Sequence, residues 1–226
     1  MPGVPEPSQI KPRRVVVVDD HPMVRERLSE VIGREVDLVV CGEADDRFLA
    51  LQVIGETQPD LAIVDLTLKN THGLDLIKDL HVMHPRVRIL VISMQEEKLY
   101  AERSIRAGAQ GYITKQEATR NILLAIRQVL AGELYLSPIL AARIASNILR
   151  KPQTSPSAAT LESLADRELQ VFELIGVGLS TKEVAEQLHL DVKTVETYRA
   201  RIKEKLHLKD ASELVRRATI WALNRE

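Results

Sequence analysis

Three aspartates and one lysine in the first half of the chain have the types and spacing that phosphoryl chemistry needs. Asp19 and Asp20 directly follow a run of valines. Asp65 ends a second apolar run, and Lys115 follows a third. Each run is typical of a buried strand, so these charges should meet where parallel strands end, beside the crevice in which such sheets bind ligands. Close carboxylates repel one another unless a cation joins them, which predicts a Mg²⁺ site beside a phosphoryl group.

Apolar runs alternate with helical patterns between residues 12 and 131. The expected strands are Val15–Val18, Leu38–Cys41, Leu61–Asp65, Val87–Ser93 and Gly111–Thr114. The stretches between them carry apolar residues at helical spacing, as at Ile122, Ala125, Ile126 and Val129. Because parallel strands need crossover connections, this order predicts a doubly wound α/β fold around a parallel five-stranded sheet. The runs are continuous rather than alternating, as expected of strands buried on both faces.

A break in composition divides the chain into two domains. Residues 151–160 have almost nothing to bury and include Pro152 and Pro156, which predicts a flexible linker. The stretch Pro138–Arg150 has apolar residues at helical spacing and predicts a helix that leads to this linker. We expect a disordered tail at 1–11, a first domain at 12–134, the linker helix and linker at 135–160, and a second domain at 161–226.

The composition narrows the setting of the protein. The 226 residues carry a net charge of −1, which alone argues neither for nor against nucleic acid. The first residues lack the apolar stretch of a signal peptide, and no run approaches the length of a membrane span. The single cysteine, Cys41, lies within an expected strand, which favours a buried apolar role over redox chemistry. We expect a soluble, cytoplasmic protein with no membrane partner.

Four short helices are expected in the second domain. Asp166 and Asp191 stand where caps of the first and third helices would lie, and Ser180 forms a capping box with Glu183 at the start of the second. The third helix, within 192–206, carries five Lys and Arg against two Glu, a charge of +3. Two short helices of which the second is basic match a helix-turn-helix that binds DNA. A plain four-helix bundle with a solvated charged face is the alternative.

The first domain resembles the receiver domain of response regulators. The matching residues are the acidic pair Asp19-Asp20, the acceptor Asp65, Ser93 at the end of the fourth strand, Tyr112, Lys115, and Gly73 at eight residues from Asp65. One departure lies three residues after the acceptor, where Leu68-Lys69 replaces the usual Met-Pro. The departure loosens the loop and adds a cation near the metal site.

The second domain resembles the LuxR-type helix-turn-helix. The matching residues are Leu164, Arg167-Glu168, Val171, Gly178, Ser180, Lys182-Glu183-Val184-Ala185, Leu188, Thr194-Val195, Ile202 and Lys205-Leu206. The chain departs from the usual pattern at Ala165, where Ser or Thr is common, and at Tyr198, where His is common. The two domains in this order resemble NarL/FixJ-type response regulators over most of the chain.

The resemblance implies a phosphorylation switch in the first domain. Asp65 would take a phosphoryl group from a phosphohistidine of a cognate histidine kinase. The Mg²⁺ ligands would be Asp19, Asp20, Asp65 and the backbone carbonyl of Thr67. Lys115 would pair with one phosphoryl oxygen and the Ser93 hydroxyl would donate to another, and Tyr112 would move with Ser93.

The resemblance also implies that residues 191–206 enter the major groove of promoter DNA. The residues approaching base edges would be Glu196, Thr197 and Ala200. Those contacting phosphates would be Lys182, Lys193, Thr194, Arg201 and Lys205. The last helix resembles a dimerisation helix, with Trp221 at the dimer interface or in the core. The implied protein is a transcription factor rather than an enzyme, acting as a homodimer on activation, with RNA polymerase as a further candidate partner.

Two other functions fit parts of the pattern. A phosphohydrolase of the haloacid-dehalogenase type would also use Asp65 as its nucleophile. It needs a second acid two residues later, where this chain has Thr67, so this function is disfavoured. A pseudo-receiver that binds DNA independently of phosphorylation is disfavoured by the complete set of acceptor-site residues, although Lys69 leaves it open.

Overall fold

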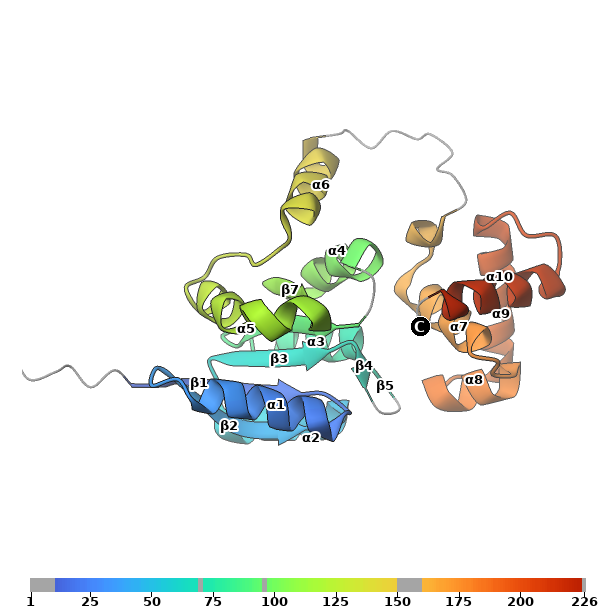
Figure 1. Ribbon diagram of the computed structural model, residues 1–226. Coiled ribbons are helices and arrows are strands. Elements are labelled where there is room, and N and C mark those ends of the chain that lie inside the picture. Colours follow the sequence, from blue (N-terminus) through green and yellow to red (C-terminus); the bar gives the residue numbers. More distant parts are fainter. Residues whose placement is uncertain (1–10, 69–70, 95–96, 150–159, 225–226) are drawn as a thin grey trace, which may run out of the picture. The chain divides into compact units, whose positions relative to one another are not determined.

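The computed structural model describes residues 11–68, 71–94, 97–149 and 160–224. They form two compact units, the first drawn mainly from the chain up to Leu136 and the second mainly from Ser137 onward (Figure 1). Residues 1–10 of the expected tail and 151–159 of the expected linker lie outside the described residues. Among the described residues, no helix is both long enough and apolar enough to cross a membrane.

Strands and helices alternate up to residue 130. The larger strands are β1 (Arg13–Val18), β2 (Leu38–Ala44), β3 (Leu61–Asp65), β6 (Arg88–Ser93) and β7 (Gly111–Thr114). The helices are α1 (Pro22–Gly33), α2 (Arg47–Thr57), α3 (Gly73–Met83), α4 (Glu97–Ala107) and α5 (Lys115–Leu130). All five expected strands are confirmed. Two short strands that the sequence did not predict, β4 (Thr67–Leu68) and β5 (Thr71–His72), pair with each other after β3.

The five larger strands form one parallel sheet in the order β2-β1-β3-β6-β7, which confirms the doubly wound α/β fold. The order reverses direction at β1, because the chain goes first to β2 on one side and then to β3 on the other. Such a reversal opens a crevice at the carboxyl ends of the strands beside it. β1 and β3 are those strands, so the fold brings the residues that follow Val18 next to Asp65.

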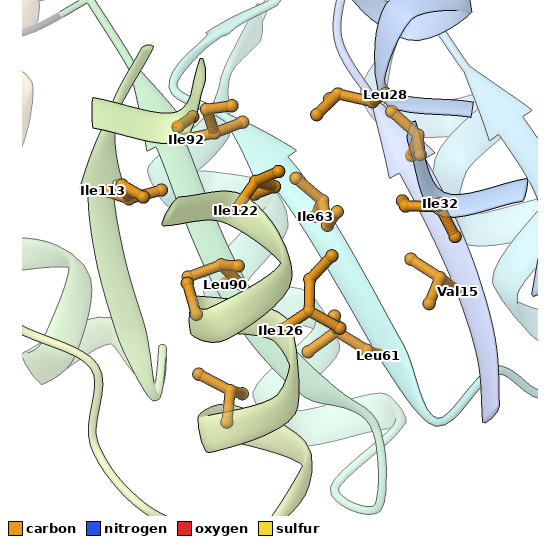
Figure 2. Close-up of a cluster of buried hydrophobic side chains, with 14 of the residues drawn as sticks. Val15, Leu28, Ile32, Leu61, Ile63, Leu90, Ile92, Ile113, Ile122 and Ile126 are labelled. Carbon is orange, nitrogen blue, oxygen red and sulfur yellow. The ribbon is translucent and has the colours of Figure 1, made fainter. Parts of the chain in front are cut away.

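Alternate residues of the strands supply the core on one face of the sheet. Val15, Leu61, Ile63, Leu90 and Ile113 pack there against side chains of α1 and α5 (Figure 2). The helical side of this cluster consists of Leu28, Ile32, Ala118, Ile122, Ala125, Ile126 and Val129. Each buried aliphatic side chain stabilises the fold by about 1.5–3 kcal/mol, so the sheet is a rigid base for the groups at its edge. Figure 1 shows α1 and α5 on this side of the sheet.

The two edge strands of the sheet, β2 and β7, differ in their local structure. At β2 the register with β1 skips Cys41, because Val15 pairs with Val40 and Val16 pairs with Gly42. Cys41 is partly exposed, so the prediction of a buried cysteine is wrong. At the other edge, Tyr135 lies beside β7 and exchanges backbone hydrogen bonds with it: the Tyr112 N–H donates to the Tyr135 carbonyl at 2.9 Å.

The second unit is helical, as expected. After α6 (Pro138–Leu149), the helices are η1 (Leu161–Ser163), α7 (Asp166–Gly176), α8 (Thr181–Leu188), α9 (Val192–Lys205) and α10 (Ala211–Leu223). Its core contains Leu169, Phe172, Ile175, Val184, Val195, Ile202, Leu214 and Ala218. The Trp221 ring lies 5.7 Å from the Phe172 ring, so the tryptophan contributes to this core.

Helix caps in this unit agree only in part with the sequence. The Ser180–Glu183 capping box of α8 is confirmed. The cap expected at Asp166 is wrong, because α7 begins at Asp166 and the Glu168 carboxylate accepts the Ala165 N–H at 2.8 Å. Asp191 lies at the N-cap of α9, but its side chain makes no capping hydrogen bond.

Candidate functional site

The acidic residues expected at the switch point lie together there. Asp19 is fully buried and Asp65 is 1% exposed. The Lys115 Nζ lies between them, 2.7 Å from Asp19 Oδ2 and 2.7 Å from Asp65 Oδ2. Asp20 is partly exposed, and its carboxylate comes close enough to those of Asp19 and Asp65 for one cation to reach all three. The strand ends therefore assemble a compact pocket of three carboxylates and one ammonium group.

The backbone around Asp65 holds this residue in place. The Gly73 N–H donates to the Leu66 carbonyl at 2.8 Å, which draws the start of α3 against the end of β3. A Cβ atom at Gly73 would lie 2.2 Å from the Asp65 carbonyl oxygen, so this close approach requires glycine. Thr67, expected to offer its carbonyl to the metal, lies in β4, and its N–H donates to Asp65 Oδ1 at 3.3 Å.

Burial dominates the electrostatics of the pocket. Desolvation raises the pKa of Asp65 to about 6; the Lys115 ammonium opposes this rise and the Asp19 carboxylate adds to it. For Lys115, burial favours the neutral form, but the attraction of Asp65 and Asp19 outweighs it and raises the pKa of the lysine. The ammonium is therefore held charged between the two carboxylates.

Ser93 and Tyr112 line the same end of the sheet. Ser93 is fully buried at the end of β6 and pairs in register with Thr114, the residue before Lys115. Tyr112 on β7 is 1% exposed and so occupies an inward position. Thr114 caps α5 through a capping box with Glu117, which fixes the start of the helix that carries Lys115.

The carboxylates fit a hard divalent cation. Asp19, Asp20, His21 and Asp65 each offer a ligand atom, and these atoms lie within 4.8 Å of one another. Asp19 Oδ2 and Asp20 Oδ1 are both buried; the Lys115 Nζ lies 2.7 Å from the first, and the His21 Nδ1 lies 2.7 Å from the second. Such oxygens suit Mg²⁺. Sequence reasoning gave no site role to His21, whose Nδ1 lies 2.7 Å from Asp20 Oδ1 and whose backbone N–H donates to Asp19 Oδ1.

A second candidate site is the exposed face of α9. Exposed residues recur along it at helical spacing, among them Lys193, Glu196, Thr197, Ala200, Arg201 and Glu204. Thr194 is partly buried, and Lys182 at the start of α8 is exposed. The residues expected to contact DNA thus share one pair of helices, α8 and α9, which the left-handed residue His189 helps to join. This is the geometry of a helix-turn-helix.

Lys205 differs from the other cations of α9. Its Nζ lies 2.6 Å from Glu168 Oε2, and the Glu168 side chain is only 4% exposed. The same oxygen accepts the Ala165 N–H, so Glu168 joins the start of α7 to the end of α9. Sequence reasoning noted Glu168 only as part of a motif, because a contact between residues 37 positions apart leaves no local signal.

Comparison with known proteins identifies both parts of the chain. Residues 15–127 match the response regulator receiver domain, and residues 162–218 match the bacterial regulatory proteins of the luxR family. The chain belongs to the NarL/FixJ-type response regulators, which join a receiver domain to a LuxR-type DNA-binding domain. The family is one of transcriptional regulators.

Several curated relatives match along most of their length. The response regulator GacA of Pseudomonas aeruginosa is 34% identical over 201 residues, which cover 89% of this chain and 92% of GacA. The oxygen regulatory protein NreC of Staphylococcus epidermidis is 33% identical over 206 residues, covering 89% of this chain and 94% of NreC. A putative transcriptional regulator of Pseudomonas aeruginosa is 36% identical, covering 89% of this chain and 95% of its own.

Solved structures share the fold. A LuxR-family two-component response regulator from Aurantimonas sp. SI85-9A1 matches 62% of this chain and all of its own, with 34% identity and a TM-score of 0.57. RcsB from Salmonella enterica serovar Typhimurium, solved bound to a promoter in the presence of the phosphomimetic BeF3−, matches 95% of this chain and 98% of its own. Its identity is 21% and its TM-score is 0.70, so this likeness concerns the fold alone.

Proposed function

We propose that a histidine kinase phosphorylates this response regulator on Asp65, and that the phosphorylated protein binds promoter DNA as a dimer to regulate transcription. One observation carries the proposal. Asp65 lies at the switch point of the sheet with Lys115 at 2.7 Å and with two further carboxylates close enough to share a cation. A carboxylate that only stabilised the fold would have no need of this second set of acidic groups.

The proposed reaction is the transfer of a phosphoryl group between two side chains. An oxygen of the Asp65 carboxylate forms a bond to phosphorus, while the bond between phosphorus and the imidazole nitrogen of the kinase phosphohistidine breaks. The imidazole leaves with the electron pair of that bond and takes up a proton. With a pKa of about 6, Asp65 is mostly ionised at neutral pH and ready to attack.

Asp19, Asp20, Asp65 and the Thr67 carbonyl would hold Mg²⁺, which when bound neutralises phosphoryl charge. The residues of the chain do the rest. Lys115 would exchange its Asp65 partner for a phosphoryl oxygen and keep Asp19 at 2.7 Å. The Ser93 hydroxyl would donate to another phosphoryl oxygen, which draws the end of β6 toward the acceptor and shifts the Tyr112 environment.

In the second unit, we propose that α9 enters the major groove. Lys182, Lys193, Thr194 and Arg201 would position the domain on phosphates, whereas Glu196, Thr197 and Ala200 would face bases. Lys205 can make its proposed phosphate contact only when its ion pair with Glu168 is broken. The nearly neutral chain attracts DNA weakly without a specific fit, so strong binding should need two copies.

We propose domain boundaries at 12–134 and 161–226, with a linker helix and a flexible linker between them. The ranges that match known families, 15–127 and 162–218, fall inside these boundaries and support them. The kinase and promoter would both be met in the cytoplasm, where we expect the protein to act.

Phosphorylation with acetyl phosphate and Mg²⁺ tests the proposal. We expect a base-labile acyl phosphate on the wild type and on Asp60→Asn, and none on Asp65→Asn. Asp60 is a matched control, because it precedes β3 at the opposite end of the sheet and pairs with Arg13. DNA binding is then compared before and after phosphorylation. Label retained on Asp65→Asn would exclude the acceptor, and equal DNA binding by all forms would favour a phosphorylation-independent regulator.

A further inference from the structure

A hydrogen bond between α8 and α9 orients the carboxylate of Glu196. The Thr181 hydroxyl donates to Glu196 Oε1 at 3.0 Å. The other oxygen, Oε2, lies 3.8 Å from Nε of Arg199, whose side chain is 15% exposed. Two neighbours on different helices therefore hold the carboxylate from both sides. The Glu196 side chain is nevertheless 58% exposed, so part of the carboxylate still faces solvent.

A carboxylate at this position is unfavourable for contact with DNA phosphates. Glu196 lies on the exposed face of α9, one helical turn from both Lys193 and Ala200. A carboxylate there repels phosphates and weakens binding to every sequence alike. It gains affinity only where a donor on a base edge faces it, and the amino group of cytosine is such a donor in the major groove.

We propose that Thr181 is a specificity-determining residue, whose hydroxyl fixes the Glu196 carboxylate so that the domain selects a cytosine amino group at one position of its site. The inference rests on the proposed DNA binding and names the group that sets its selectivity. A free glutamate has several rotamers and could turn away from a wrong base at little cost. A glutamate held by Thr181 must first give up that hydrogen bond to turn away, so a base without the donor is more often left facing a desolvated carboxylate.

The rest of the local structure separates this role from a purely structural one. Thr181 is the first residue of α8, but Ser180 provides the cap of that helix by accepting the Glu183 N–H. Replacing Thr181 with valine keeps its shape and leaves the cap in place. The hydroxyl of Thr197 on α9 donates instead to the Lys193 carbonyl, so it does not compete for Glu196.

The test uses the full-length protein treated with acetyl phosphate and Mg²⁺, a DNA site selected from a random pool, and all single-base variants of that site. For Thr181→Val we expect the preference for cytosine at one position to fall roughly 2- to 10-fold, the range of one lost hydrogen bond. Preferences elsewhere and the salt dependence should not change. Thr181→Ser should restore the preference, and Glu196→Gln should move it toward adenine.

Lys182→Met provides the contrast, because loss of a phosphate contact weakens all sites alike and flattens the salt dependence by about one unit of log-log slope.

Three results would overturn the inference. Thr181→Val could keep the full preference, it could weaken all sites equally, or Glu196→Gln could leave every preference unchanged. The melting temperature of each variant shows whether the helices remain folded. If the wild type binds no DNA at all, the proposed function fails together with the inference. If Lys182→Met behaves as expected and Thr181→Val does not, only the inference fails.

Discussion

The raised pKa of Asp65 predicts that this residue makes the first unit less stable as pH rises. Burial places its pKa at about 6, whereas an unperturbed aspartate titrates near 3.8. The folded protein therefore binds this proton more tightly than the unfolded chain does. The corresponding stability is fully present below about pH 3.8 and is lost as pH rises through about 6.

The size of the effect follows from the shift. A difference of about 2.2 pKa units is worth about 3 kcal/mol at 1.36 kcal/mol per unit. Between about pH 4 and pH 7 the change is about 2 kcal/mol, because part of it has already occurred at pH 4. In Asp65→Asn the titrating group is absent, while Lys115 keeps Asp19 at 2.7 Å. The unfolding free energy of the wild type minus that of Asp65→Asn should therefore fall by about 2 kcal/mol from pH 4 to pH 7.

Hydrogen exchange of the backbone amides of β1 and β3, with EDTA present, measures this free energy for the first unit separately. Titration of the Asp65 carboxyl carbon by NMR gives the pKa directly, and Mg²⁺ should lower it. Asp37→Asn is a control of opposite sign, since hydrogen bonding to Arg127 lowers the pKa of Asp37. For that pair the advantage of the wild type should grow as pH rises to about 3.8 and stay nearly level from there to pH 7. A difference between the wild type and Asp65→Asn that is constant, or that grows with pH, would refute the reasoning.

Three further perturbations test other parts of the structure. Gly73→Ala should destabilise the fold by about 2–4 kcal/mol and impair phosphorylation, because its Cβ would meet the Asp65 backbone, whereas Gly33→Ala, with nothing within 4 Å, should be tolerated in thermal melts. A double-mutant cycle of Glu168→Gln and Lys205→Met should give a coupling of about 1–3 kcal/mol in urea unfolding; additive effects would contradict the ion pair at 2.6 Å. Limited proteolysis should first cut residues 151–160, and primary cleavage elsewhere would contradict the proposed domain boundary.

The sequence predicted the features that depend on local pattern. Continuous apolar runs located all five strands, since strands of a parallel sheet are buried on both faces. The order of the units predicted that Asp19, Asp65 and Lys115 would meet. In the structure, the Lys115 Nζ lies 2.7 Å from a carboxylate oxygen of each aspartate. Chain connectivity alone brings these groups to one edge, because crossovers of one hand return every strand in the same direction.

Features set by contacts between distant segments were not predictable. Cys41 lies in a strand-forming run, yet it falls at an irregularity in the pairing of β2 with β1 and is partly exposed. Asp166 is a good capping residue by type, but α7 begins at Asp166 itself, and the carboxylate of Glu168 accepts the N–H of the N-cap residue Ala165. For Cys41 a partner strand elsewhere in the fold decides the outcome, whereas for Asp166 the competing residue lies in the same helical turn.

Lys115 and Lys205 show why the role of a lysine depends on its partner rather than on its motif. Each has a carboxylate partner within 2.7 Å. Lys115 faces two carboxylates, Asp19 and Asp65, so in the proposed mechanism it can give up one for a phosphoryl oxygen without losing all compensation for its charge. Lys205 faces the single, almost buried Glu168, and a move toward DNA would leave that carboxylate buried without its cation. The first arrangement permits an exchange of partners and the second opposes it. The same physical argument therefore favours the proposed switch role of Lys115, and it favours for Lys205 a role mainly in holding α9 in place.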